Sequence, residues 1–243
     1  MSSSTSAPVN ATIARLSFQA LFGRRRGLVL MLIPALLIAL AVLIRVLTEQ
    51  GVGYELVDAV GFTLALPIVA LLAASAVLGP EIDDGSIVYL IAKPVRRHTV
   101  TLSKYVVGWL STLVFGALPL FVAGLVIDSS DPERALGWLV GGAVAGTTYA
   151  ALFLGLAALT RHAVVIGLLF VLLWEGLLGN VFSGIRWFAI GAWGRETAGA
   201  VSSAVSDAGT GLTYALVASA LVTAISVWFA GDRLRSFTLR GDE

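Results

Sequence analysis

The sequence predicts an all-α integral membrane protein with six transmembrane helices, an N-terminal amphipathic interfacial helix and a re-entrant connection between the fifth and sixth spans. First, 58% of the 243 residues are hydrophobic and only 13% are charged, a balance that a soluble domain cannot cover with polar surface. Second, six apolar stretches have about the 20 residues that a helix needs to cross the hydrocarbon layer. Third, Lys and Arg are distributed unevenly between alternate connections.

The N-terminal region precedes the first span. Residues 1–10 are rich in Ser and are predicted to be disordered, and residues 11–243 are expected to form a single transmembrane domain. From Ala11 to Arg26, apolar residues recur at helical spacing, which favours an amphipathic helix in the cytoplasmic interface. Its basic residues are Arg15, Arg24, Arg25 and Arg26. A plain positively charged anchor is the alternative. The first apolar run is too long for a signal peptide and should remain as a span.

The six predicted spans are Gly27–Ile44, Val60–Gly79, Tyr105–Ile127, Ala135–Thr160, Ala163–Gly179 and Leu212–Ala230. Each of the first three contains one proline, at Pro34, Pro67 and Pro119, so we expect kinks there. The fourth carries small residues at Gly137, Gly141, Gly142, Gly146 and Ala150. Glycine lets two backbones approach closely, which predicts tight helix packing, and a partner helix within this chain is favoured over a second copy.

The basic residues set the orientation. If the N-terminus is cytoplasmic, twelve of the sixteen Lys and Arg residues face the cytoplasm. The other four are Arg45, Arg134, Arg186 and Arg195. Both termini are therefore predicted to be cytoplasmic, which requires an even number of spans and agrees with six.

Two outer connections differ in character. Val46–Ala59 is acidic and is expected to be a loop. Residues 180–211 form the longest outer connection, and their first part is too apolar for a free loop and too rich in glycine for a span. Short helices that dip into the outer leaflet, anchored by aromatic residues, fit this pattern. The second part, Ala198–Gly211, is small and polar and leads into the last span.

The sequence offers little for catalysis. The two histidines, His98 and His162, lie in predicted cytoplasmic loops far apart in the chain. There is no HExxH metal motif, no GxxxxGK[ST] nucleotide loop and no cysteine. A serine nucleophile at membrane depth would lack a base. We therefore expect neither an enzyme nor a metal or cofactor site in this chain.

Glu175 is the one ionisable residue inside a predicted span. A carboxylate at membrane depth is costly, which favours a function such as lining a substrate path. Glu175 also lies about one turn from the outer end of its span, where the following connection could donate hydrogen bonds. Substrate path and support of the re-entrant connection both remain open at this point.

A polar segment, residues 80–104, separates the second and third spans. It begins with acidic residues, ends with basic ones and holds a short apolar patch between them. Pro94 disfavours helix at Lys93, which predicts a helix, a tight basic turn and a second helix on the cytoplasmic side. The apolar ridge suits a groove of a partner protein. A lipid surface is the alternative, but an anionic leaflet would repel the acids.

This segment resembles the type-2 permeases of ATP-binding-cassette exporters. The likeness rests on Glu81-x-x-x-Gly85-Ser86, on the turn Lys93-Pro94-Val95-Arg96-Arg97, and on Ser103-Lys104 before the third span. The overall layout of six spans, an amphipathic start and a re-entrant connection is also similar. Arg96 departs from the pattern, because that family more often has a small polar residue there.

The resemblance implies a function. Segment Glu81–Lys93 would be a coupling helix seated in a groove of a separate ATP-binding-cassette ATPase subunit, which would bind ATP and Mg²⁺. The implied coupling residues are Glu81, Asp84, Gly85, Ile87, Leu90, Pro94, Arg96, Arg97 and Lys104. A second permease, identical or homologous, would complete an exporter in a bacterial inner (plasma) membrane. The apolar spans favour an amphiphilic substrate, and no nucleic-acid partner is expected.

Two other functions are compatible with the sequence. A membrane anchor or sensor subunit could recruit a cytoplasmic partner through the same segment without transporting anything. A secondary carrier is disfavoured, because such carriers usually need ionisable residues deeper in the membrane than Glu175.

Overall fold

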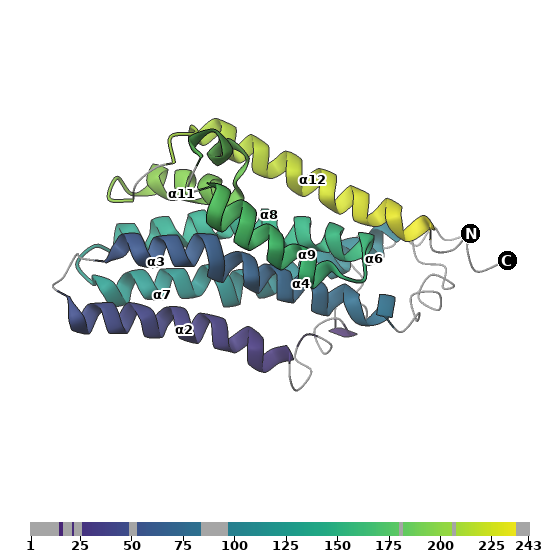
Figure 1. Cartoon of the computed structure of the whole chain (residues 1–243), viewed down its shortest axis with the longest axis horizontal. Coiled ribbons are helices and arrows are strands. Elements are labelled where there is room, and N and C mark those ends of the chain that lie inside the picture. The colour runs from purple at the N-terminus through teal and green to yellow at the C-terminus, as the bar shows by residue number, and fades with distance from the viewer. Residues whose placement is uncertain are drawn as a thin grey trace, which may run out of the picture.

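The computed structural model describes residues 15–16, 21, 26–48, 53–83, 97–179, 182–205 and 208–236. The helices lie along one long axis and form an elongated bundle (Figure 1). They are α2 (Arg26–Leu47), α3 (Tyr54–Val60), η1 (Gly61–Ala65), α4 (Leu66–Asp83), α6 (Arg97–Thr112), η2 (Leu113–Ala117), α7 (Leu118–Ile127), α8 (Pro132–Leu159), α9 (Ala163–Leu169), η3 (Phe170–Leu178), η4 (Ser183–Phe188), α11 (Ile190–Val201) and α12 (Leu212–Ser236).

Within the described ranges, five helical stretches are long and apolar enough to cross a membrane. They are Gly27–Leu47, Tyr54–Leu78, Thr99–Ile127, Pro132–Leu159 and Leu212–Arg233. The predicted fifth span corresponds to a shorter apolar helix, Ala163–Leu178, made of α9 and η3. The all-α, multi-pass architecture is confirmed. Six crossings remain a prediction, because this helix falls short of the length of the others.

The start of the second span differs from the prediction. Residues expected in the loop Val46–Ala59 form α3, which continues through η1 into α4. The helix begins after Gly53, whose φ of 87° is left-handed and suits glycine. Helix α6 begins at Arg97, where the sequence predicts a helix after the basic turn, and its first two turns are a polar extension of the apolar span predicted from Tyr105.

Two prolines follow short π-helical stretches. The N–H of Leu66 donates to the carbonyl of Gly61, and that of Leu118 donates to Leu113, each five residues back. Pro67 and Pro119 come directly afterwards. A proline ring clashes with the carbonyl four residues earlier in a regular α-helix, so the wider turn makes room for it. The expected irregularity thus takes the form of a π-bulge, whereas Pro34 lies in the unbroken α-helix α2.

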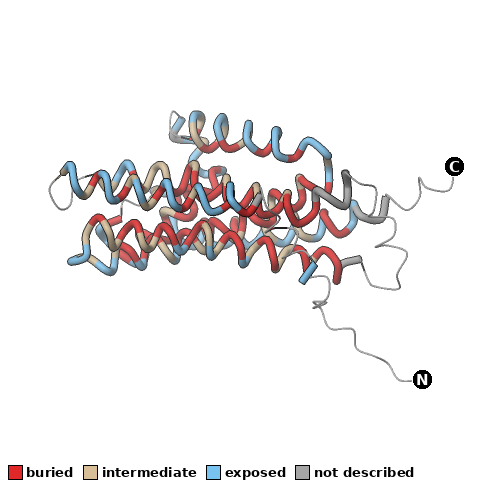
Figure 2. The backbone as a smooth tube through the Cα atoms, turned by 90° about the horizontal axis from the view of Figure 1, so that it is seen from below, coloured by how far each residue is buried: buried red, intermediate tan, exposed pale blue. Residues whose placement is uncertain are grey.

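Helix α8 lies at the centre of the bundle. It packs against α4, α6, α7, α11 and α12. Its large side chains Trp138, Tyr149 and Phe153 are fully buried, and the rings of Tyr149 and Phe153 stack with centroids 5.9 Å apart. Buried residues run through the interior while exposed ones line the outside (Figure 2). The core that holds the other elements in place is therefore built around one helix.

The glycines of α8 make close contacts on two faces. A Cβ atom at Gly141 would lie 2.2 Å from the carbonyl oxygen of Gly194 in α11. A Cβ at Gly142 would lie 3.3 Å from the Cα of Ala117 in η2. Close helix approach is confirmed, and both of these contacts lie within the chain.

Helices α2 and α12 lie at the outside of the bundle (Figure 1). In the most apolar part of α12 only 11% of the residues are buried, whereas the figure for the stretch Tyr54–Leu78 is 72%. Its exposed side chains include Leu221, Ile225 and Trp228. Such apolar faces suit contact with lipid, as expected for a multi-pass membrane protein.

Candidate coupling site and outer connection

The structure describes only part of the predicted coupling segment. Glu81 lies in the last turn of α4, and Arg97 is the first residue of α6. The other predicted coupling residues of the turn lie outside the described residues: Asp84, Gly85, Ile87, Leu90, Pro94 and Arg96. The two helices that lead into and out of this segment pack against each other.

The predicted interfacial helix is described in part. Arg15 is exposed, and Arg26 is the first residue of α2. Arg24 and Arg25 lie outside the described residues. The amphipathic helix therefore remains a prediction.

Lys104 joins α6 to α4. Its side chain is 1% exposed, and its Nζ donates a hydrogen bond of 2.7 Å to the carbonyl oxygen of Val77. Thr101 and Ser103 beside it are also buried, and the Ser103 hydroxyl donates to the carbonyl of Thr99. Lys104 was predicted as a coupling residue; because it is buried within its own chain, any part in coupling would come from fixing two helices together.

Glu175 lies in η3 and is 2% exposed. Its Oε1 accepts a hydrogen bond of 2.8 Å from the N–H of Ile190, and its Oε2 accepts one of 3.2 Å from Gly191. These are the first two residues of α11, whose N–H groups have no partner inside the helix. A carboxylate also favours the positive end of the helix dipole. Glu175 therefore caps α11.

Gly191 lets this cap form at close range. A Cβ atom there would lie 3.1 Å from Oε2 of Glu175 and 3.1 Å from the carbonyl oxygen of Phe62 in η1. Both distances are tighter than an ordinary van der Waals contact. The glycine thus allows the start of α11 to sit between η3 and η1.

Three charged residues for which the sequence predicts no site role, Glu196, Arg195 and Asp58, also hold α11 in place. The carboxylate of Glu196 in α11 accepts hydrogen bonds from the N–H groups of Thr210 (3.1 Å) and Gly211 (2.9 Å), just before α12. Arg195 of α11 lies 3.7 Å from a carboxylate oxygen of Asp58 in α3. In the sequence, the feature that marks these contacts is the charged pair Arg195-Glu196 within a stretch of small and aromatic residues.

Aromatic side chains hold η4 against its neighbours. The indole N–H of Trp174 donates to the carbonyl of Phe188, at 3.2 Å. The indole N–H of Trp193 and the hydroxyl of Tyr214 both donate to the carbonyl of Trp187, at 3.0 and 2.8 Å. Trp187 and Phe188 themselves remain exposed. The backbone carbonyls of Trp187 and Phe188 are hydrogen-bonded while their rings are exposed, as expected for the predicted anchors in the outer leaflet.

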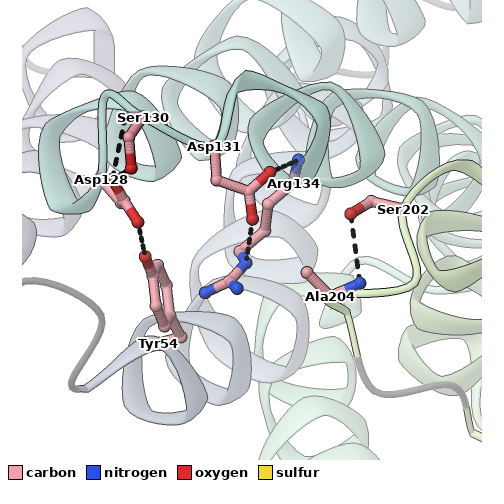
Figure 3. A network of polar contacts seen from close by, with 7 residues as sticks. All are labelled: Tyr54, Asp128, Ser130, Asp131, Arg134, Ser202 and Ala204. Atoms are coloured by element: carbon pink, nitrogen blue, oxygen red, sulfur yellow. Dashed lines mark hydrogen bonds and ion pairs between the residues drawn. The ribbon is translucent and has the colours of Figure 1, made fainter.

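A polar network ties the start of α3 to the end of α7 and the start of α8 (Figure 3). The hydroxyl of Tyr54 donates to Asp128 at 2.7 Å, and Ser130 donates to the other oxygen of the same carboxylate. Arg134 forms an ion pair with Asp131 and lies over the ring of Tyr54, 3.5 Å from its centroid. Hydrogen bonds from Ser130 and then from Tyr54 lower the pKa of Asp128 to about 2.

Metal ligands do not cluster in the part of the chain that the structure describes. Nowhere in those residues do three His, Asp or Glu side chains come together as a possible metal site. The buried carboxylates of Glu175 and Glu196 accept hydrogen bonds from backbone N–H groups.

Comparison with known proteins identifies the family. No curated protein matches the chain. The family model described as ABC-2 family transporter protein matches residues 23–185, which is more than half of the chain and includes the whole segment 80–104. The resemblance inferred from the Glu81–Gly85 and Pro94–Arg97 motifs is thereby confirmed, and the chain belongs to the ABC-2 family of transporter proteins.

Proposed function

We propose that this ABC transporter permease couples ATP hydrolysis by a separate ATPase subunit to the efflux of an amphiphilic substrate. The observation that carries the proposal is the pairing of α4 and α6 on either side of the segment that holds the family motif. Lys104 ties these two helices together just inside the segment. A push on the segment would then move both helices at once.

The nucleotide chemistry belongs to the partner in this proposal. Two ATPase subunits would bind ATP and Mg²⁺ and close on each other. Each would carry a groove for the coupling helix Glu81–Lys93, and the N-terminal interfacial helix would make a second contact with the same subunit. Closure would bias a membrane domain that has two arrangements, one open to each side.

We further propose six crossings with both termini in the cytoplasm of a bacterial cell, in its inner (plasma) membrane. The positive-inside distribution of Lys and Arg supports this orientation. The start of α2 and the end of α12 lie at the same end of the bundle (Figure 1), which also favours an even number of crossings. A second permease, identical or homologous, would form the other half of the path.

For Glu175 we propose support of the re-entrant connection. Its carboxylate accepts two backbone N–H groups of α11 and is buried. A carboxylate that lines an aqueous path would instead face a cavity or solvent. The buried helix α11, between η4 and α12, would be the re-entrant element.

Co-expression with a candidate ATPase tests the proposal. The two proteins should co-purify, and the permease alone should have no ATPase activity. Replacement of Gly85 by Trp or of Glu81 by Lys should uncouple ATP hydrolysis from transport while membrane insertion stays intact. Normal transport by both variants would overturn the coupling-helix assignment. A permease that binds the ATPase but shows no nucleotide-dependent change in its spans would instead be an anchor or sensor subunit.

A further inference from the structure

The outer connection contains two buried carboxylates that bind backbone in the same way. We infer that Glu175 and Glu196 are a pair of positioning residues that lock η3, α11 and the start of α12 into one unit closing the outer side of the permease. The part of the inference that concerns transport rests on the proposed function. The locking itself does not.

The first lock joins η3 to α11. Both oxygens of Glu175 are used, one for each of the first two N–H groups of α11. The side chain is 2% exposed, so water cannot replace these bonds easily. Hydrogen bonds to a charged group are stronger than neutral ones, and a buried donor left without a partner is costly.

The second lock joins α11 to α12. Glu196 is 8% exposed, and its two oxygens accept the N–H groups of Gly211 and Thr210, respectively. Gly211 has a φ of 85°, a left-handed conformation that suits glycine and turns the chain into α12. The carboxylate thus fixes the turn from which the last helix starts.

Further contacts bind α11 to the rest of the bundle. Its first five residues, Ile190–Gly194, are all buried. It crosses α8 with the backbone of Gly194 against Gly141, and Arg195 faces Asp58 of α3. Because α11 is held at its start and in its middle, an outward opening at this place requires η3, α11 and the start of α12 to move together.

Cysteine labelling provides the test, because the chain has no cysteine of its own. Ala192 is 1% exposed, so an Ala192→Cys reporter should react slowly with a water-soluble maleimide. In the purified permease, Glu175→Gln and Glu196→Gln should each raise its labelling rate about tenfold or more, because the lost charge-assisted hydrogen bonds are worth at least one factor of ten. Glutamine keeps the volume, but its NH₂ group cannot accept a hydrogen bond.

Three controls distinguish local release of α11 from unfolding of the whole protein. Glu133→Gln changes an exposed carboxylate in α8 and should leave the rate unchanged. Ala200→Cys is exposed and should react equally fast in every background. Ala151→Cys, at a fully buried position of α8, should stay unreactive in both glutamine variants. Equal rates at Ala192→Cys in all backgrounds, or a parallel rise at Ala151→Cys, would overturn the inference.

A second readout uses the permease assembled with its ATPase. Labelling of Ala192→Cys should depend on ATP when both glutamates are present and should become fast and independent of ATP in the double glutamine variant. If the two glutamates had a purely structural role, the double glutamine variant would be less stable, but its labelling at Ala192→Cys would still depend on ATP. If the glutamine variants release Ala192 in the permease alone while ATP has no effect on the assembled protein, the locks are supported and the proposed exporter function fails.

Discussion

Buried charges in this permease are matched to backbone. Lys104 donates to the carbonyl of Val77, while Glu175 and Glu196 accept from N–H groups near the starts of α11 and α12. Each pairing satisfies a peptide group as well as a charge, so it fixes the position of a helix end or turn. Such a group can affect function by fixing the positions of helices, without contact to a partner subunit or a substrate.

Replacement of Lys104 by Met tests whether this residue positions helices or contacts the partner subunit. Methionine keeps much of the apolar stem but removes a charge-assisted hydrogen bond of about 1.5–3 kcal/mol, partly offset because the ammonium no longer has to be desolvated. We expect the Kd for the ATPase to stay within about twofold, as for a change away from the interface. ATP-dependent movement of the spans should weaken, because α4 and α6 are no longer tied.

Binding of the ATPase to immobilised permease measures this effect. Gly85→Trp, in the predicted contact segment, is the matched variant that should weaken binding. A loss of affinity in Lys104→Met as large as that in Gly85→Trp would mean that Lys104 contacts the partner after all.

Asp128 gives a prediction about pH. Its pKa of about 2 is below the ordinary value of 3.8, so its bonds contribute stability above about pH 4, and this contribution is lost as the pH falls through about 2. The difference in melting temperature between the wild type and Tyr54→Phe should therefore be constant from pH 8 to pH 5. Thermal unfolding in detergent measures it, and a difference that disappears between pH 7 and pH 5 would contradict the assignment.

A double-mutant cycle checks the contact itself. Tyr54→Phe and Asp128→Asn both remove the bond between α3 and the end of α7. Their combined effect on the melting temperature should be smaller than the sum of the single effects. Strict additivity would mean that the two side chains do not interact.

Helix elements show what the sequence could predict and what it could not. The spans follow from apolar length, and five of the six predicted stretches correspond to helices long enough to cross a membrane. Glycines in α8 predicted close approach, but their spacing does not name the partner helix, which is α11 for Gly141 and η2 for Gly142. Glu175 stood out because it is charged in an apolar run. Glu196 did not, because the connection around it is mixed in polarity.

The crossing of α8 and α11 is the tightest helix contact that these glycines make. Gly141→Ala would place a Cβ 2.2 Å from a backbone oxygen, which no rotamer change can relieve, so the helices must move apart. We expect a loss of about 1–3 kcal/mol in stability, typical of overpacking. Gly184→Ala, where no heavy atom lies within 4 Å of the added Cβ, is the matched control.

Thermal unfolding of both glycine variants measures the difference. If Gly141→Ala unfolds at the same temperature as Gly184→Ala, the two backbones are not in contact at this crossing. A lower unfolding temperature for Gly141→Ala alone supports the contact between the backbones of α8 and α11.

At the scale of the whole molecule, the short helix Ala163–Leu178 decides the topology. At the α-helical rise of 1.5 Å per residue its 16 residues would reach at most about 24 Å, against a hydrocarbon layer of about 30 Å, and the nine π-helical residues Phe170–Leu178 make it shorter still. In its C-terminal part, Glu175 accepts a hydrogen bond from the start of α11, and the indole N–H of Trp174 donates to the carbonyl of Phe188. Protein therefore packs against one side of this end of the helix, where Glu175 is buried, whereas Leu173 and Leu177 on the other side stay exposed.

A six-span topology can be tested with single cysteines at four exposed positions: Ser130, His162, Ala204 and Asp232. In sealed cells, an impermeant maleimide should label cysteines at Ser130 and Ala204, whereas those at His162 and Asp232 should react only after permeabilisation. We expect this outcome because the distribution of Lys and Arg predicts that the loop after α8 and the end of α12 lie in the cytoplasm. If His162 and Ala204 are labelled from the same side, α9 and η3 do not cross, and the chain has five spans with its termini on opposite sides.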